Sequence, residues 1–188
     1  MLIRRERTGD AVTIDAVHRS AFERSPGNPS ADPANPSADA ANPATDPVEV
    51  GLVHRLRDDG SAWIPTLSLV AEFQDQVVGH VCLTRAGVGP FPVLALGPIG
   101  VLPAHQGKGI GSALMHAALG AADALDEPLV GLLGSLEYYP RFGFVPGTRL
   151  GILPDVADWT SHFQVRPLTA YELEIKGDFH YADAFYAL

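Results

Sequence analysis

Hydrophobic spacing in the N-terminal third of the chain predicts one strand and two helices. Residues 2–7 predict a short strand, and the turn and capping residues Thr8-Gly9-Asp10 follow it. A helix then extends to about Phe22, because apolar side chains recur three and four residues apart. Residues 48–58 predict a second helix on similar grounds. The apolar positions are Ile14, Val17 and Ala21 in the first helix, and Val50, Val53 and Leu56 in the second.

The middle of the chain predicts a hairpin, two further strands and a long helix. Residues 66–73 and 77–85 predict strands joined by Gln74-Asp75-Gln76, and residues 92–101 predict the next strand. A glycine-rich turn follows and opens a helix at about Gly109, and residues 129–133 predict a short buried strand. The expected apolar face of the long helix comprises Ile110, Ala113, Leu114, Ala117, Ala121 and Leu125.

The order of these elements indicates the fold class. Strands and helices interleave and a hairpin is included, which predicts an α/β domain around a mixed sheet. A length of 188 residues suits a single domain, 1–188.

Residues 25–47 depart from this pattern, because an Asn-Pro heptapeptide recurs there from Asn28, Asn35 and Asn42. Proline in every repeat disfavours a helix, and the repeat has no apolar seam for a coiled coil. We interpret the segment as an insertion in a surface loop; the alternative is a lid or partner arm over a site.

Charge narrows the classes of partner. Asp and Glu outnumber Lys and Arg by 22 to 13, giving a net charge of −9, and the basic residues are scattered. Nucleic acid and anionic membranes bind mainly through clustered basic residues, so neither is expected as a partner.

No apolar stretch reaches the about 20 residues of a membrane helix, and no signal-peptide pattern is present. A cytoplasmic protein is expected, and a cationic substrate suits its charge.

The single cysteine, Cys82, excludes an internal disulfide and a zinc site built from several cysteines. It falls in the middle of a predicted strand, where a small buried hydrophobic residue is expected rather than a nucleophile. No metal is expected.

The most informative segment is residues 101–114. A strand ends there, the chain turns through glycines and a helix begins, so free backbone N–H groups and the positive end of the helix dipole meet at one place. Gly107, Gly109 and Gly111 would let a phosphate approach the backbone, and Lys108 adds a cation. The segment therefore predicts an anion site.

Two common phosphate motifs do not fit. A Walker A loop requires Ser or Thr where Ile110 stands, and its lysine follows the last glycine rather than preceding it. A dinucleotide fingerprint requires a third glycine where Ser112 or Leu114 stands.

Gln106, Gly109 and Gly111 do fit the pattern Gln/Arg-x-x-Gly-x-Gly/Ala, which resembles the acetyl-CoA pyrophosphate loop of the GNAT superfamily of N-acyltransferases. A second element, Tyr138-Tyr139-Pro-Arg-Phe-Gly-Phe144, resembles the Tyr-x-Lys/Arg-x-Gly-Phe element of that family. The tail, residues 179–185, is similar to the ending of a bacterial branch of predicted acetyltransferases. The resemblance covers nearly the whole chain except residues 25–47.

The resemblance implies a central mixed, mostly antiparallel twisted sheet flanked by helices, with its fourth and fifth strands splayed apart for acetyl-CoA. The pantetheine arm would pair with the backbone of the fourth strand, and the pyrophosphate would bind the amides of the glycine-rich loop, with Arg141 near a phosphate. The implied cofactor-binding residues are Ile99, Gly100, Val101, Gln106, Gly107, Lys108, Gly109, Ile110, Gly111, Ser112 and Arg141.

The family's general acid is a tyrosine four residues before the Gly of Gly-Phe, and Tyr139 holds that position. Its phenol would protonate the departing thiolate, since the two groups have similar pKa values near about 10. Tyr138 is its competitor; if the backbone is extended, the two side chains point to different faces.

The general base stays open. A primary amine is almost entirely protonated at pH 7, so a proton must be removed. Glu72 and His80 lie on predicted central strands and are candidates, although hairpin pairing or a hydrogen-bonded strand position is the more common explanation for each. His105 is interpreted as a surface residue at a helix start. No acidic residue lies between Phe91 and Val101, so a water relay or the substrate's own ionisation also remains possible.

The expected activity is direct transfer of acetyl from acetyl-CoA to a primary amine of a small molecule, peptide or protein. The alternative is a non-catalytic acyl-CoA-binding module of the same fold, and the net charge disfavours a tRNA-acting toxin. Trp63 and Trp159 lie in predicted loops and either pack there or line the amine pocket. A monomer or homodimer is expected.

Overall fold

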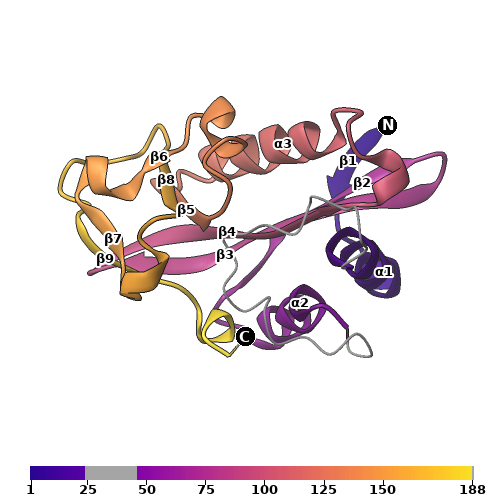
Figure 1. The fold of residues 1–188 in the computed structure, drawn as a ribbon, viewed down its shortest axis with the longest axis horizontal. Helices are drawn as coiled ribbons and strands as arrows, with labels where there is room; N and C mark the ends of the chain where they lie inside the picture. The colour runs from indigo at the N-terminus through magenta and orange to yellow at the C-terminus, as the bar shows by residue number, and fades with distance from the viewer. Residues whose placement is uncertain (24–45, 188) are drawn as a thin grey trace.

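A computed structural model of the chain describes residues 1–23 and 46–187 (Figure 1). The insertion expected at about 25–47 lies almost entirely outside the described residues. Its role in a surface loop, and the assignment of residues 1–188 to one domain, stay predictions.

Nine strands of the described chain form one sheet. The main path is β1-β2-β3-β4-β5-β8-β6, and β9 pairs with both β3 and β7. Neighbouring strands are antiparallel except for the pairs β4–β5 and β7–β9. This confirms the expected mixed, mostly antiparallel sheet. The strands are β1 (Leu2–Arg5), β2 (Trp63–Phe73), β3 (Gln76–Val88), β4 (Phe91–Val101), β5 (Leu129–Leu133), β6 (Val145–Pro146), β7 (Ile152–Pro154), β8 (Phe163–Pro167) and β9 (Gly177–His180).

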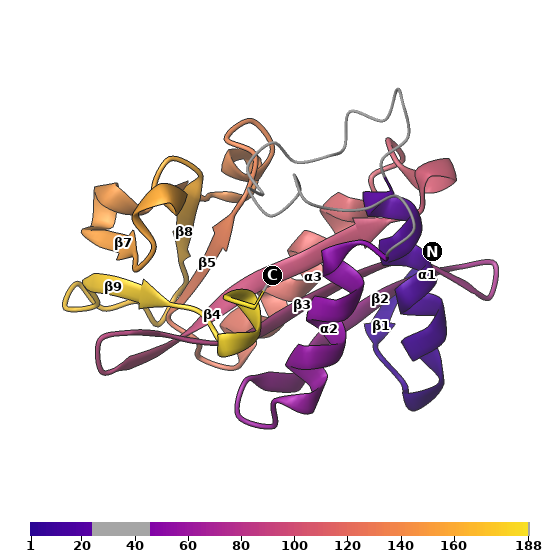
Figure 2. The same ribbon diagram turned by 60° about the horizontal axis from the view of Figure 1, so that its bottom comes forward.

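Helices cover both faces of the sheet (Figures 1 and 2). On one face lie α1 (Ala11–Phe22), which packs against β3 and β4, and α2 (Val48–Asp58), which packs against α1. On the other face α3 (Ile110–Ala124) packs against β2 and β3. None of the described helices is long and apolar enough to cross a membrane. Short 3-10 helices span Thr8–Asp10, Pro103–His105, Tyr139–Phe142, Gly147–Leu150, Ala157–Trp159 and Asp183–Phe185.

The apolar face expected for α3 is partly wrong. Ile110 and Leu114 are buried as expected, but Leu125 lies beyond the helix and is 48% exposed. The fully or nearly fully buried residues of the helix are Ile110, Leu114, Met115, Ala118, Leu119 and Ala122. The prediction followed the evenly spaced alanines. The larger side chains of Met115 and Leu119 gain more free energy from burial, so the side of the helix that carries them faces the sheet.

The hairpin between β2 and β3 turns at Gln74 and Asp75, whose φ angles are 50° and 61°. Two consecutive residues with positive φ match the twist of antiparallel strands, so Gln76 already belongs to β3. Trp63 begins β2, opposite Thr84, and does not lie in a loop as predicted. The expected strand at 2–7 ends at Arg5.

The C-terminal segment returns to the sheet. Phe179 pairs with Val88 on β3, and its ring covers Gly131 of β5, where a Cβ would lie only 2.5 Å from the ring. Phe185 approaches Gly97 of β4, and its short helix also contacts α2. The C-terminal segment thus packs against the sheet next to the region where β4 pairs with β5.

Candidate active site

The strands β4 and β5 diverge after a short paired region (Figure 2). Their parallel pairing consists of Leu94 with Val130 and Ala95 with Gly131. Beyond Ala95, β4 continues to Val101 along β3 alone, within the described residues. A gap therefore opens between β4 and β5, as the fold prediction required.

Part of the β4 backbone faces this gap. Leu102 N–H donates to the carbonyl oxygen of Val78 at 2.9 Å, and His80 lies opposite Gly100. Because pairing groups alternate along an antiparallel ladder, the N–H and C=O of Gly100 face β3, whereas those of Ile99 and Val101 face the gap. The Gln106 side chain donates to the Val101 carbonyl at 2.9 Å. Polar backbone groups of Ile99 and the Val101 N–H are left directed at the gap.

The glycine-rich loop lies at the end of β4 and at the start of α3. Gly107 and Gly109 have φ angles of 70° and 82°, and a Cβ at either residue would meet open space. No acidic residue lies in the first turn of α3, and no side chain caps it. The free amides and the helix dipole can therefore act as an anion site. Lys108 Nζ donates to the Ala104 carbonyl at 2.8 Å, at the surface of this loop.

Tyr138 belongs to the α3 side of the site. Its hydroxyl lies near Ser112 and would lie 3.0 Å from a Cβ at Gly111. Burial raises the pKa of Tyr138. The guanidinium of Arg141 lies 4.8 Å from the centre of its ring. The structure thus brings Ser112, Gly111 and Arg141 together around this phenol.

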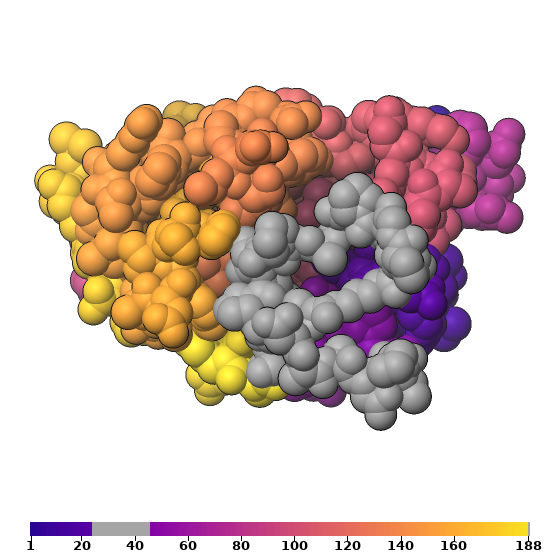
Figure 3. All heavy atoms as spheres, viewed as in Figure 1, coloured from indigo at the N-terminus to yellow at the C-terminus, as the bar shows by residue number. Residues whose placement is uncertain are grey.

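Tyr139 lies beside the end of β5. Its side chain is buried, and its ring occupies the space that a Cβ of Gly134 would fill. Phe144 contacts the ring edge-on, with centroids 5.8 Å apart. The backbone at Tyr138 and Tyr139 is helical rather than extended, and the two rings meet edge-on at 5.1 Å. In Figure 3 the residues that follow β5 and those around the start of α3 are exposed on the same face.

The two candidate bases have different surroundings. Glu72 accepts from Arg4 Nε at 2.8 Å near the end of β2. His80 on β3 is fully buried, and its Nε2 lies 2.9 Å from Ser68 Oγ. Its Nδ1 lies 2.8 Å from Nε2 of His18, which belongs to α1. The sequence interpretation missed His18.

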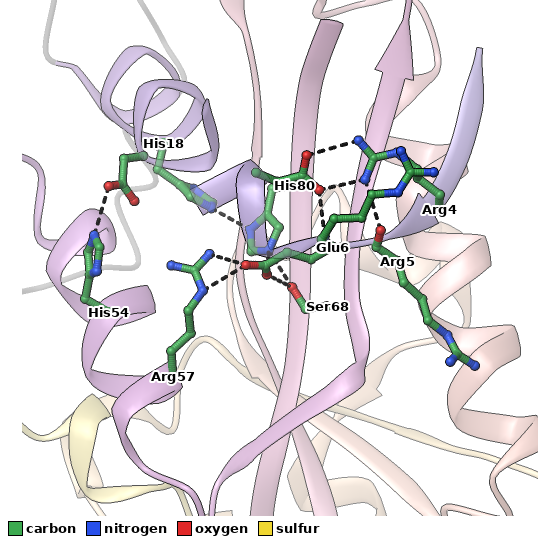
Figure 4. Close-up of polar contacts among 11 residues, drawn as sticks. Arg4, Arg5, Glu6, His18, His54, Arg57, Ser68 and His80 are labelled. Carbon is green, nitrogen blue, oxygen red and sulfur yellow. Dashed lines mark hydrogen bonds and ion pairs between the residues drawn. The ribbon is translucent and has the colours of Figure 1, made fainter. Parts of the chain in front are cut away.

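A buried polar cluster surrounds His80, and we call Glu6, His18, Arg57, Ser68 and His80 the histidine cluster. Figure 4 shows Glu6 between Arg57 and the Ser68–His80 pair, with His18 reaching toward His80. Arg57 contacts Glu6 at 2.9 Å. A sequence signal for His18 did exist, because it follows Ile14 by four residues and so lies on the apolar face of the helix.

Burial sets the charge states in the cluster. It lowers the pKa of His18 well below 6.5, and the nearby His80 and Arg57 add to this effect. Burial also lowers the pKa of His80, although Glu6 opposes the shift. Burial alone would raise the pKa of Glu6, but the nearby His80, the hydrogen bond from Ser68 and the charge of Arg57 lower it. The cluster therefore holds two neutral imidazoles and one carboxylate at neutral pH.

The other residues considered in the sequence analysis are buried or contact neighbouring side chains. Cys82 is fully buried, as predicted, and burial raises the pKa of its thiol to about 12. His105 meets the edge of Phe73, and Trp63 lies under the guanidinium of Arg57. Trp159 lies in a 3-10 helix and stacks on Tyr186. No group of three or more His, Cys, Asp or Glu side chains within residues 1–23 and 46–187 could hold a metal ion.

Comparisons with known proteins agree with this geometry. The model of the acetyltransferase (GNAT) family matches residues 38–144. The protein YjhQ of Escherichia coli (strain K12), an uncharacterized N-acetyltransferase, is 38% identical over 102 residues, which are 52% of this chain and 56% of YjhQ. The chain thus matches little more than half the length of this curated relative.

Solved structures match over nearly the full length. YhbS from Escherichia coli, a GNAT family N-acetyltransferase in complex with CoA, is 28% identical with a TM-score of 0.80, covering 98% of this chain and 91% of that one. A GNAT family acetyltransferase from Brucella melitensis in complex with acetyl-CoA is 31% identical with a TM-score of 0.71, covering 98% and 97%. The chain belongs to the GNAT family of acetyltransferases.

Proposed function

We propose that this protein transfers the acetyl group of acetyl-CoA to a primary amine by direct attack. The gap between β4 and β5 is the observation that carries the proposal. One side of the gap is the backbone of Ile99 and Val101, and the anion site at the start of α3 lies at its end. A molecule that joins an amide-containing arm to a pyrophosphate suits this arrangement.

The residues present fit both parts of acetyl-CoA, the pyrophosphate and the pantetheine arm. The open space at Gly107 and Gly109 admits a phosphate to the backbone N–H groups. Lys108, Ser112 and Arg141 add a cation, a hydroxyl and a second cation near the same helix start. The backbone of Ile99 and Val101 can pair with the amides of a pantetheine arm, as a strand would. The matched structures from Escherichia coli and Brucella melitensis are complexes with CoA and acetyl-CoA, which supports this assignment.

Tyr139 is the general acid of the proposed reaction. As the amine nitrogen bonds to the thioester carbon and the C–S bond breaks, the Tyr139 hydroxyl gives its proton to the sulfur. Glu72 and His80 are the proposed alternatives for the proton acceptor. His80 suits this role better, because Glu72 is held by Arg4 near the end of β2, whereas His80 lies on β3 opposite Gly100 of β4.

Thiol release from acetyl-CoA, measured over a panel of primary amines with wild-type protein, tests the proposal. We expect release that depends on one class of amine, together with an acetylated amine detected by mass spectrometry. Binding of acetyl-CoA without transfer to any small amine, peptide N-terminus or lysine peptide would instead support the non-catalytic acyl-CoA-binding module.

A further inference from the structure

The hydrogen bonds of the histidine cluster have a definite direction. The Ser68 hydroxyl donates to Glu6 Oε2, and a hydroxyl has only one proton to give. Ser68 must therefore accept from His80, whose Nε2 lies 2.9 Å away. The proton of neutral His80 is thus on Nε2, and its Nδ1 accepts from Nε2 of His18 at 2.8 Å. This leaves Nδ1 of a neutral His18 unprotonated.

His18 Nδ1 has no hydrogen-bond partner among the described residues, although its side chain is fully buried. A buried acceptor without a partner is costly, so it calls for an explanation. The atom lies over Gly100, where a Cβ would be only 2.9 Å away. The unprotonated nitrogen therefore lies over the face of β4 at Gly100, between Ile99 and Val101, the two residues whose backbone faces the gap.

We propose that His18 Nδ1 receives the proton of the attacking amine and that His80 and Ser68 pass a proton on to Glu6. This inference rests on the proposed acetyl transfer and adds a proton path to it. Because His18 Nδ1 is fully buried, the proposed path requires one water between the amine and Nδ1. His18 is thus the first group of the proposed relay. The sequence interpretation considered Glu72 or His80 as single bases and did not include such a relay.

The relay balances in protons. The amine attacks in its neutral form, and its nitrogen loses one proton as the bond to the acetyl carbon forms. Tyr139 gives one proton to the departing sulfur and regains one from water. His18 gains this proton at Nδ1 and releases the one on Nε2 to His80 Nδ1. His80 then releases its Nε2 proton to Ser68, whose own proton moves to Glu6. Each intermediate group gains one proton and loses one, and Glu6, whose side chain is 12% exposed, returns the proton to water.

The variant His18→Gln tests the relay. The amide nitrogen of Gln can still donate to His80, but Gln offers no basic nitrogen at the Nδ1 position. General base catalysis contributes about 100-fold or more, so we expect kcat to fall by about that factor while KM for acetyl-CoA stays near the wild-type value. The matched control is His54→Gln, because His54 lies on exposed α2 surface and pairs with Asp15; its kcat should stay unchanged.

Two further readouts separate a proton relay from a structural role. Removal of the imidazole in His18→Ala opens a cavity, and added imidazole should restore part of kcat in this variant but not in His18→Gln. Nitrogen-15 spectra of the wild-type histidines should show His18 and His80 neutral, each with the proton on Nε2. Wild-type kcat in a folded His18→Gln, absence of imidazole rescue, or a proton on Nδ1 of His18 would each overturn the relay.

Failure of the relay can be told apart from failure of acetyl transfer. If wild-type protein transfers acetyl but His18→Gln matches it, only the relay is wrong. If wild-type protein releases no thiol with any amine, the proposed function fails first, and the relay has no reaction to serve.

Discussion

At the scale of single residues, Tyr138 and Tyr139 are neighbours with different surroundings. The Tyr138 hydroxyl lies near Ser112 at the start of α3, and the Tyr139 ring lies on Gly134 beside β5. In the proposed reaction the phenol near the helix start would act on the phosphate end of acetyl-CoA, and the phenol beside β5 on the thioester. We therefore expect the two tyrosines to affect different kinetic constants.

The variant Tyr139→Phe should lower kcat by about 100-fold, the lower end of what a general acid contributes, with acetyl-CoA affinity nearly unchanged. Tyr138→Phe is the matched comparison. It loses the hydroxyl that lies beside Gly111 and Ser112 at the helix start, so we expect weaker acetyl-CoA binding with kcat largely kept. Steady-state kinetics and calorimetric binding on both variants check this, and wild-type turnover in Tyr139→Phe would remove Tyr139 from the mechanism.

The histidine cluster also predicts how stability depends on pH. The groups that face His18 and His80 are Glu6, Arg57 and Asp10. Both imidazoles stay neutral in the folded state below their ordinary pKa of 6.5, whereas the unfolded chain takes up protons there. The unfolded state binds more protons, so the free energy of unfolding falls as pH drops below about 6.5.

Urea unfolding at pH 7.5 and pH 5.5 measures this loss. His18→Gln removes one of the two imidazoles, so the variant should lose less stability between these pH values than wild type does. Equal losses in wild type and His18→Gln would contradict burial of a neutral His18.

At the scale of elements, the start of α3 depends on backbone conformation more than on side chains. Gly109 caps the helix with a φ of 82°, a conformation that costs a residue with a side chain about 1 kcal/mol or more. Gly120 lies in the same helix without a positive φ, and a Cβ there would meet open space. The two glycines thus form a matched pair for testing the loop.

Gly109→Ala should lower the free energy of unfolding by about 1 kcal/mol or more, and Gly120→Ala should raise it by about 0.5–1 kcal/mol. Acetyl-CoA should still raise the melting temperature of Gly120→Ala, because a ligand stabilises the state that binds it. Gly109→Ala should lose most of that rise. An undiminished rise in Gly109→Ala would place the cofactor away from this loop.

The sequence predicted elements with strong periodicity and missed features that depend on distant contacts. The bounds of α2 and β5 were predicted to the residue, and the gap beside β4 followed from the family motifs. The strands β6, β7 and β9 have two to four residues, too few to show a period. The His18–His80 contact joins residues 62 apart in the sequence, and no local pattern indicates which buried polar groups will meet.

At the scale of the whole molecule, the groups proposed for cofactor binding and for proton transfer lie on the two sides of β4. The side of the sheet that carries α3 has the proposed anion site and Tyr138. The side that carries α1 has the histidine cluster, in which His18 lies over Gly100. The divergence of β4 from β5 leaves the backbone of Ile99 and Val101 directed at the space between them. The proposed reaction needs these parts at once, because the cofactor must be held while a proton leaves the amine.

A calorimetric titration of acetyl-CoA into wild-type protein, with Gly109→Trp as the blocked comparison, tests the central claim most directly. We predict micromolar binding to wild type and loss of binding in a Gly109→Trp variant that circular dichroism shows to be folded. Absence of binding to folded wild type, or equal binding by Gly109→Trp, would contradict the assignment of the gap and the helix start to acetyl-CoA.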